Sequence, residues 1–253
     1  MRCLVTGDLH FNLRQFDWIG TVADRYDAVI LTGDLLDMTG HQSRHQQLRQ
    51  VGDYLRQWRG QTHLLVVSGN HDAVDADHRA DWLEVATAAG CFVDGDTVVF
   101  DAASFTLCPW RDDPLTEAEL AQLLRTAPVP SDRPWIWVHH EPPAGAAVSW
   151  SGRTARGSAA LAQLVRRQYP QFVLSGHIHD APFVEGGTWI DRMGATQLVN
   201  HGRQPGDVPA HVVLDFAQDE VHWIAVGARD TRPLAANRRP SLPEARGPVP
   251  AFG

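Results

Sequence analysis

The sequence predicts a single α/β domain, and three observations lead to this prediction. Short apolar runs alternate along the chain with segments of helical periodicity. The runs are apolar at consecutive positions, as in strands buried on both faces, and five of them end in a cluster of Gly, Asp, Asn or His. With 253 residues, 43% of them hydrophobic, the chain can bury one sizeable core. Since no repeat or interdomain linker interrupts it, we place one domain over residues 1–227.

The first third of the chain shows the alternation most regularly. Its apolar runs are three or four residues long and rich in Val, Ile and Leu, as is typical of buried strands. Between the runs, apolar residues recur at intervals of three and four, which indicates helices with one buried face. We therefore predict strands at 3–5, 28–31 and 64–67 and helices over 13–23, 41–58 and 82–89.

The remainder of the chain contains more closely spaced strands and one capped helix. Thr116 and Glu119 form a Thr-x-x-Glu capping box, which predicts a helix that begins there and continues to Arg125. The last 27 residues contain five prolines and five arginines, so we predict a C-terminal tail over 228–253 rather than a further domain. The predicted strands are 98–100, 105–107, 135–138 and 172–174, followed by a meander of 197–199, 211–216 and 221–226.

Charge and cysteine content limit the classes of partner and compartment. The net charge of −8 provides no overall basic field, so we expect no non-specific nucleic-acid binding. The three cysteines cannot all pair and lack zinc-type spacing, which indicates a reducing compartment. No apolar window reaches the length of a membrane span, and we expect a cytoplasmic protein without membrane contact. Hydrophobic strands in the C-terminal meander would suit a homodimer, or equally a tail folded over them.

The polar clusters that end five of the predicted strands are rich in metal-binding side chains. Carboxylate oxygens and imidazole nitrogens are ligands for Mn, Fe and Zn, and an Asp-x-His or His-x-His spacing turns both side chains to one face. In α/β sheets, the carboxyl ends of strands are also where ligands bind. Each cluster alone is common, but their ordered combination predicts a site for two metal ions. The clusters are Gly7-Asp8-Leu9-His10, Gly33-Asp34-Leu35-Leu36-Asp37, Gly69-Asn70-His71-Asp72, His139-His140-Glu141-Pro142-Pro143 and Gly176-His177-Ile178-His179.

This ordered set resembles the motifs of the calcineurin-like metallophosphoesterase superfamily. The resemblance covers about residues 2–200 and implies a four-layer α-β-β-α sandwich, with a metal pair at the carboxyl ends of the strands. The protein Ser/Thr phosphatases of the superfamily carry Arg-Gly after the second motif, whereas this chain has Met38-Thr39 there. The chain is therefore more similar to the small bacterial phosphodiesterase-like members.

The resemblance also implies roles for individual residues. His71 would face the substrate and Asp37 would pair with it, because an imidazole bonded to a carboxylate keeps a fixed orientation and a raised pKa, suited to protonating a leaving oxygen. The family pattern assigns Asp8, His10 and His179 to one metal ion, Asn70, His140 and His177 to the other, and Asp34 as the bridge between them.

Several assignments stay open at the level of sequence. His139 and His140 are adjacent and only one can point at the metal; alignment on Pro142-Pro143 favours His140. The candidates for substrate contact follow or flank the strand ends, and their alternative role is loop solubility or core packing. These candidates are Trp110, Arg111, Arg153 and His201.

The implied function is a dinuclear metal-dependent phosphohydrolase. It would cleave phosphate esters, mainly diesters of small molecules, by attack of a metal-bridging hydroxide with His71 assisting. Two carboxylates offset only part of the charge of two Mn, Fe or Zn ions, so the site would attract phosphate anions. The alternatives are a nuclease of the same superfamily, which the acidic charge disfavours, and a non-catalytic interaction module, which the complete ligand set disfavours.

Overall fold

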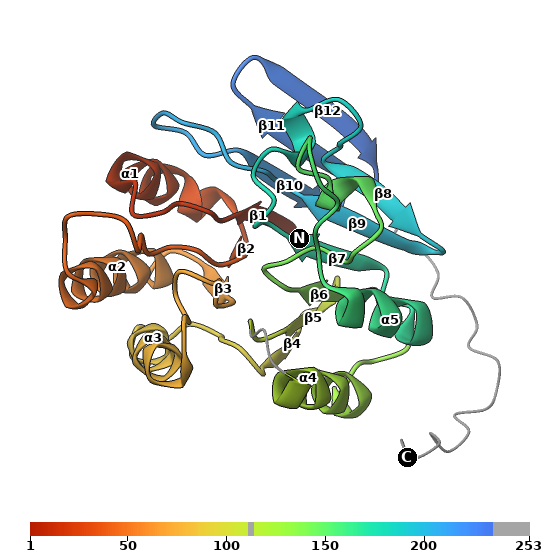
Figure 1. Cartoon of the computed structure of the whole chain (residues 1–253), viewed down its shortest axis with the longest axis horizontal. Helices are drawn as coiled ribbons and strands as arrows, with labels where there is room; N and C mark the ends of the chain where they lie inside the picture. Colours follow the sequence, from red (N-terminus) through yellow and green to blue (C-terminus); the bar gives the residue numbers. More distant parts are fainter. Residues whose placement is uncertain (111–113, 235–253) are drawn as a thin grey trace.

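Two six-stranded sheets lie face to face between two layers of helices (Figure 1). The structure is a computed structural model that describes residues 1–110 and 114–234, with the backbone alone for 114–117. This arrangement confirms the predicted α/β class and the four-layer α-β-β-α sandwich.

The first sheet joins an N-terminal parallel part to a C-terminal antiparallel part. β1 pairs in parallel with β2, and β2 with β3, whereas β10 pairs antiparallel with β1 and begins a meander. The strand order is β12 (Ala228–Pro233), β11 (Glu220–Ala225), β10 (His211–Asp215), β1 (Arg2–Thr6), β2 (Ala28–Leu31) and β3 (His63–Val66).

The second sheet has four parallel strands and an antiparallel strand at each edge. β5, β6, β7 and β9 run in parallel, while β4 and β8 are antiparallel to their neighbours. The strand order is β4 (Thr97–Val99), β5 (Ser104–Leu107), β6 (Trp135–Val138), β7 (Phe172–Ser175), β9 (Thr196–Asn200) and β8 (Ile190–Met193).

Helices cover the outer face of each sheet. Three helices pack on the first sheet through one apolar cluster, and two pack on the second sheet through another. The helices on the first sheet are α1 (Leu13–Val22), α2 (Arg44–Arg59) and α3 (Ala76–Ala88); those on the second are α4 (Pro114–Thr126) and α5 (Ala159–Gln168). Single 3-10 turns are η1 (Ala23–Arg25), η2 (Ala147–Ser149) and η3 (Ala181–Phe183).

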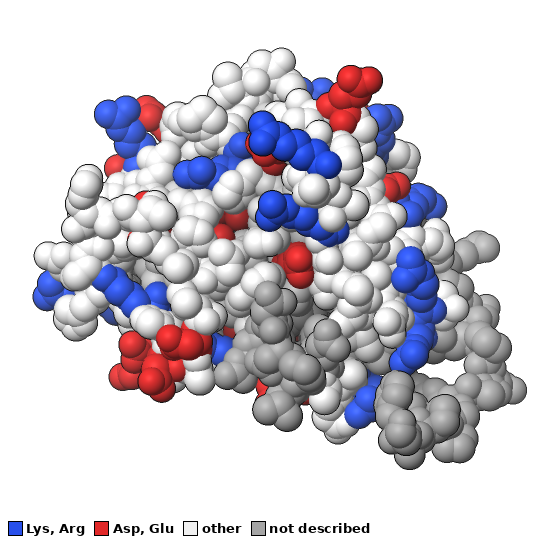
Figure 2. All heavy atoms as spheres, in the orientation of Figure 1, with Lys and Arg blue, Asp and Glu red and all other residues white. Residues whose placement is uncertain are grey.

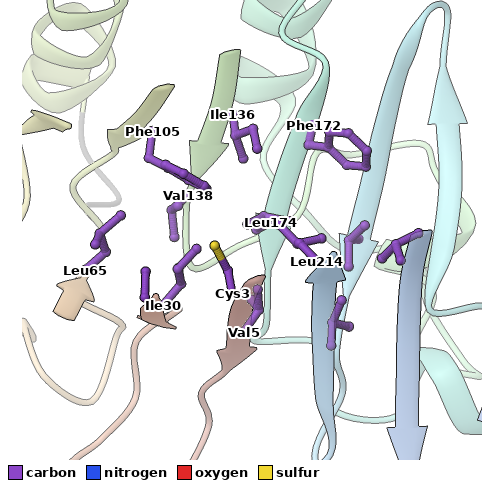
Figure 3. Close-up of a cluster of buried hydrophobic side chains, with 14 of the residues drawn as sticks. Cys3, Val5, Ile30, Leu65, Phe105, Ile136, Val138, Phe172, Leu174 and Leu214 are labelled. Atoms are coloured by element: carbon purple, nitrogen blue, oxygen red, sulfur yellow. The ribbon is translucent and has the colours of Figure 1, made fainter. Parts of the chain in front are cut away.

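The alternation of side chains along each strand divides the core into three clusters. Cys3 and Val5 point between the sheets, where they meet Phe105, Val138 and other residues of the opposite sheet (Figure 3). Leu4 points the other way, to the helices. Because successive side chains of a strand face opposite sides, one apolar run fills two core layers. Packing thereby fixes the strands on both faces, and the loops at their carboxyl ends begin from fixed positions.

Four expectations from the sequence need correction. The strand over 197–199 is not part of the C-terminal meander: β9 pairs in parallel with β7, and the chain then crosses to the other sheet before β10. Helix α4 begins at Pro114, so Thr116 lies inside it. Helix α5 and strand β8 were not predicted. Residues 228–233, assigned to the tail, form β12 and pair with β11, and the remaining residues 235–253 lie outside the described part.

The free edge of the first sheet is polar. All residues of β12 except Asp230 are exposed, and they include Arg229 and Arg232. The hydrophobic strands predicted in the meander are β10 and β11, and both lie inside the sheet, with β12 at the edge. Among the helices in the described ranges, none combines the length and the apolar character needed to cross a membrane.

Candidate metal centre

The five polar clusters predicted from the sequence follow β1, β2, β3, β6 and β7, and their side chains converge. Because these are adjacent parallel strands of two facing sheets, their carboxyl ends meet at one edge of the sandwich. Three groups of side chains there have potential ligand atoms within 4.8 Å of one another. The groups are Asp8, His10, Asp34 and His179; Asp34, His140 and His177; and His10, Asp37 and His71.

In the first group, two imidazoles face two carboxylates. Nε2 of His10 lies 3.1 Å from Nε2 of His179 and 3.7 Å from Oδ2 of Asp34. Nε2 of His179 lies 3.3 Å from Oδ1 of Asp8. Asp8 is fully buried, and the backbone N–H of His177 donates to both of its oxygens. The imidazoles of His10 and His179 thus lie near the carboxylate of Asp8, which backbone hydrogen bonds hold in place.

In the second group, His140 is the central residue. Its Nε2 lies 3.3 Å from Oδ2 of Asp34, 3.0 Å from Oδ1 of Asn70 and 3.2 Å from Nδ1 of His177. Oδ2 of Asp34 therefore contacts both groups. Its other oxygen, Oδ1, accepts a hydrogen bond of 2.8 Å from the backbone N–H of His71, which fixes the carboxylate between the two groups.

The orientation of His140 answers the question that the sequence left open. Nδ1 of His140 lies 2.8 Å from the carbonyl oxygen of Thr32, so Nδ1 carries a proton and donates, and Nε2 is directed at the cluster. His139 belongs to none of the three groups, and its Nδ1 donates to the carbonyl of Glu141. The structure therefore brings His140, and not His139, into the group with Asp34.

The backbone at the site adopts conformations that side-chain-bearing residues rarely take. Of the seven non-Gly residues with positive φ in the described ranges, four are candidate ligands. Such conformations are costly and persist where the surrounding structure enforces them, most often at functional sites. The four are Asp8 (φ 51°), His10 (φ 42°), Asp34 (φ 55°) and His177 (φ 64°).

Two glycines allow the carboxylates to approach neighbouring loops. A Cβ atom at Gly69 would overlap Oδ1 of Asp34, and a Cβ atom at Gly176 would overlap Oδ2 of Asp8. Any larger residue would push these carboxylates out of the cluster. The Gly-Asn-His and Gly-His-x-His motifs thus need glycine for space.

Asp72 fixes the loops around the site, a role that the sequence analysis did not assign. It is fully buried and accepts 3.0 Å hydrogen bonds from the backbone N–H groups of Leu35, Leu36 and Gly69. Burial, together with the charge of Asp34, raises the pKa of Asp72 to about 7. On the other side of the turn, Arg44 donates to the carbonyl of Asp72 at 2.6 Å. The only sequence signal was the position of Asp72 directly after His71.

Replacement of Asp72 by Ala should lower the free energy of unfolding by about 3–5 kcal/mol, because three buried N–H groups lose their acceptor. Urea denaturation followed by circular dichroism measures this change. Asp81→Ala, at an exposed position of α3, is the control and should change stability by less than about 0.5 kcal/mol. Equal stability of Asp72→Ala and the native protein would show that the loops are held by other contacts.

The protonation states of four candidate ligands suit metal binding, whereas His140 must lose a proton to bind a metal ion. Burial lowers the pKa of His10 and His177 to about 4, so both imidazoles are neutral at pH 7. Burial would raise the pKa values of Asp8 and Asp34, but the neighbouring imidazoles hold them below the ordinary value. Burial likewise disfavours protonated His140, yet the Asp34 carboxylate outweighs it and raises its pKa to about 9.

Metal binding should therefore release at least the proton of His140, since Nε2 cannot hold a proton and a metal ion together. Calorimetric titration with Mn²⁺ near pH 7 in two buffers of different ionisation enthalpy measures the proton count. We expect the apparent affinity to rise by up to about tenfold per pH unit between pH 6 and 8 for each proton released. Buffer-independent heats and pH-independent affinity would contradict this expectation.

Asp37 and His71 do not form the expected hydrogen bond in this structure. Oδ1 of Asp37 accepts from the backbone N–H and the hydroxyl of Thr39, both at 2.8 Å. Nδ1 of His71 instead accepts from the backbone N–H of Met38 at 3.2 Å. A neutral His71 therefore carries its proton on Nε2. The ring lies edge-on to His10, with 4.4 Å between centroids.

The structure places the predicted substrate-contact residues in different surroundings. Trp110 is 9% exposed and packs against His140 and His177, with centroid distances of 5.4 and 5.2 Å, so it lies behind the candidate ligands. His201 is fully buried: its Nδ1 donates to the carbonyl of Gly202 and its Nε2 lies 2.7 Å from the Thr32 hydroxyl. Its Nε2 also lies 3.7 Å from Oδ2 of Asp8, so His201 lies directly behind a candidate ligand and is covered by the chain in this structure. Arg153 is exposed, and Arg111 lies outside the described residues.

The donor set fits a metal ion. Two pairs of imidazole nitrogens lie 3.1 and 3.2 Å apart around a shared carboxylate, and each nitrogen that lacks a proton can bind a metal ion. Carboxylate and imidazole ligands without thiolates fit Mn, Fe or Zn. All three cysteines are buried and free, and none belongs to the groups.

The fold and this site define a class of metal-binding phosphoesterases, and comparison with known proteins agrees. The family model for calcineurin-like phosphoesterases matches residues 1–181, and the chain belongs to this family. The comparison with curated proteins found no match. Among solved structures, the chain is similar to the protein TT1561 of Thermus thermophilus, with 16% identity, a TM-score of 0.56 and coverage of 92% of this chain and 98% of that one. It is also similar to a dimetal phosphatase from Danio rerio, with 12% identity, a TM-score of 0.55 and coverage of 88% and 95%.

Proposed function

We propose that this protein is a dinuclear metal-dependent phosphohydrolase. One observation carries the proposal: Oδ2 of Asp34 lies within 3.7 Å of His10 and 3.3 Å of His140, the central donors of two separate ligand groups. Asp8, His10 and His179 would hold one ion, Asn70, His140 and His177 the other, with Asp34 between them. The similar fold of a dimetal phosphatase supports two ions rather than one.

The charge of the loaded site favours phosphate esters as substrates. Asp8 and Asp34 supply two negative charges, and the remaining ligands are neutral, so two divalent ions would leave the site positive. When bound, such ions supply Lewis-acid chemistry that activates water and offsets charge on the phosphate oxygens. The buried carboxylates of Asp8 and Asp34 would hold the ions, and the imidazole of His179 is partly exposed to solvent.

His71 would protonate the oxygen that leaves. Met38 donates to its Nδ1, which keeps the proton of the neutral ring on Nε2. Its own backbone N–H is bonded to Asp34, and the guanidinium of Arg44 lies 3.3 Å from its carbonyl oxygen. These contacts fix the residue on both sides, so Nε2–H is a positioned general acid.

Among phosphate esters, we propose that small diesters are the substrates and that the protein acts in the cytoplasm. A diester carries one negative charge at phosphorus, and the Met38-Thr39 sequence lacks the arginine that the protein phosphatases place after the second motif. Figure 2 shows arginine side chains interspersed with acidic ones over the visible face, and acidic side chains gathered over α3. The net charge of −8 disfavours a nucleic-acid backbone as the substrate.

The reaction class is tested with metal-free protein that is reconstituted with Mn, Fe, Zn or Mg in turn. Hydrolysis of bis-p-nitrophenyl phosphate and of p-nitrophenyl phosphate is measured side by side. We expect metal-dependent turnover that is faster with the diester. Faster hydrolysis of the monoester would contradict the diester preference, and no turnover with two bound ions would contradict the enzymatic function and favour an interaction module.

A further inference from the structure

The loop that follows β9 brings Arg203 to the edge of the candidate metal centre. Its backbone N–H donates to the carbonyl of His179 at 3.0 Å, and Nε of its side chain donates to the carbonyl of Asp8 at 3.0 Å. These carbonyls belong to the two loops that carry the first ligand group. Arg203 therefore links the ends of β1 and β7 directly beside candidate ligands.

The Arg203 loop is held against the first turn of α1. The side-chain amide of Asn12 donates to the carbonyl of Gly206 at 3.0 Å, and that of the buried Gln15 donates to the carbonyls of Gln204 and Gly206. Contacts on both sides of Arg203 thus restrict the position of its backbone. A side chain that is fixed before binding loses less conformational entropy when a ligand arrives.

The guanidinium of Arg203 has no anionic partner in the described part of the chain. The anchoring contacts use only Nε and the backbone N–H, so the two Nη groups retain their donors. Arg14, which lies on the same side of the molecule, does have a partner: its Nη1 lies 3.3 Å from Asp207. Placing an unpaired cation beside a site that would itself be positive is unfavourable unless an anion binds there.

We infer that Arg203 binds a non-bridging oxygen of the substrate phosphate at the edge of the metal centre, through its free Nη groups. The inference rests on the phosphohydrolase function proposed above. Guanidinium and phosphate form short, charge-assisted hydrogen bonds, and lysine reproduces the charge without the planar pair of donors. Arg203 is thus a further arginine expected to bind substrate, in addition to those predicted from the sequence.

The test compares Arg203→Gln and Arg203→Lys with the native protein after metal reconstitution. For Arg203→Gln, we expect the KM for bis-p-nitrophenyl phosphate and the dissociation constant of inorganic phosphate, measured by calorimetry, to rise by about 10- to 100-fold. The value of kcat should change much less, and Arg203→Lys should be intermediate. Metal content should equal that of the native protein.

Arg14→Gln is the matched control, since it removes an exposed arginine near the same loop, and it should leave both constants unchanged. Native affinity for phosphate in Arg203→Gln would overturn the inference, and so would loss of metal from that variant, which would show that Arg203 only supports the ligand loops. A native protein that binds two ions but neither hydrolyses the ester nor binds phosphate would instead refute the proposed function.

Discussion

Replacement of Asp34 by Ala should remove both metal ions and lower turnover by at least about 1,000-fold. Asp34 is the only residue whose carboxylate belongs to both ligand groups around His10 and His140 in the described part of the chain. Without it, each group keeps its imidazoles but loses the shared negative charge that offsets repulsion between the ions. Metal content by mass spectrometry and turnover on the same sample measure the two effects together.

Two further variants sharpen the Asp34 test. Asp34→Asn keeps the size of the side chain and an oxygen for the backbone N–H of His71, so it should fold like the native protein yet bind fewer than two ions. Asp53→Ala removes an exposed carboxylate on α2 and should change neither readout. Two ions and full turnover in Asp34→Asn would mean that Asp34 is not the bridge.

Replacement of His71 by Ala should lower turnover by about 100- to 10,000-fold while the metal content stays at the native value. His71 contacts Asp34 through its backbone only, and alanine keeps that hydrogen bond. The loss comes from the missing proton donor, so it should be larger for esters with an alkoxide leaving group than for nitrophenyl esters, whose leaving group needs no proton. A His71→Ala protein that has lost its metal would contradict this role.

His78→Ala is the control for His71. His78 lies in the first turn of α3 and contacts Asp75, away from both ligand groups. Its replacement should leave turnover for both classes of ester unchanged. An equal reduction for alkyl and nitrophenyl esters in His71→Ala would indicate that His71 orients the substrate and does not protonate it.

The clusters at the strand ends were predictable because local sequence determines them. A run such as Ala28-Val29-Ile30-Leu31 is buried on both faces, so it can only be a central strand, and the polar residues after it must lie at the sheet edge. Asp34 follows β2 of the first sheet and His140 follows β6 of the second, so the two meet because the sheets pack face to face with these strand ends at one edge. The order of the four layers follows from the alternation of strands and helices along the chain.

Features that depend on contacts distant in sequence were not predictable. The sheet that β9 joins is decided by its pairing with β7, which no pattern within Thr196–Asn200 encodes. Rotamers of short loops decide whether Asp37 bonds Thr39 or His71, and both partners were chemically suitable. The burial of His201 depends on Thr32 and Gly202, which only the folded chain brings to it.

Some missed features did carry a local signal. Ser158 caps α5 by accepting from the backbone N–H of Leu161, and apolar residues at 161, 164 and 165 follow it at helical spacing. The capping box near Thr116 was a weaker signal than the proline at position 114, a residue favoured in the first turn of helices. Strand β12 was not predicted because its residues lack the apolar pattern of a strand; they are polar, as is usual for a sheet edge exposed to water.

The most direct test of the dinuclear site is a plot of turnover against bound metal. Metal-free protein is reconstituted with increasing amounts of Mn²⁺, and the metal content and the hydrolysis of bis-p-nitrophenyl phosphate are measured on each sample. A site built around Asp34 predicts turnover that stays low up to about one ion per chain and reaches its plateau at about two. A plateau at one ion, or undiminished turnover in the metal-free protein, would contradict the dinuclear phosphohydrolase proposed for this chain.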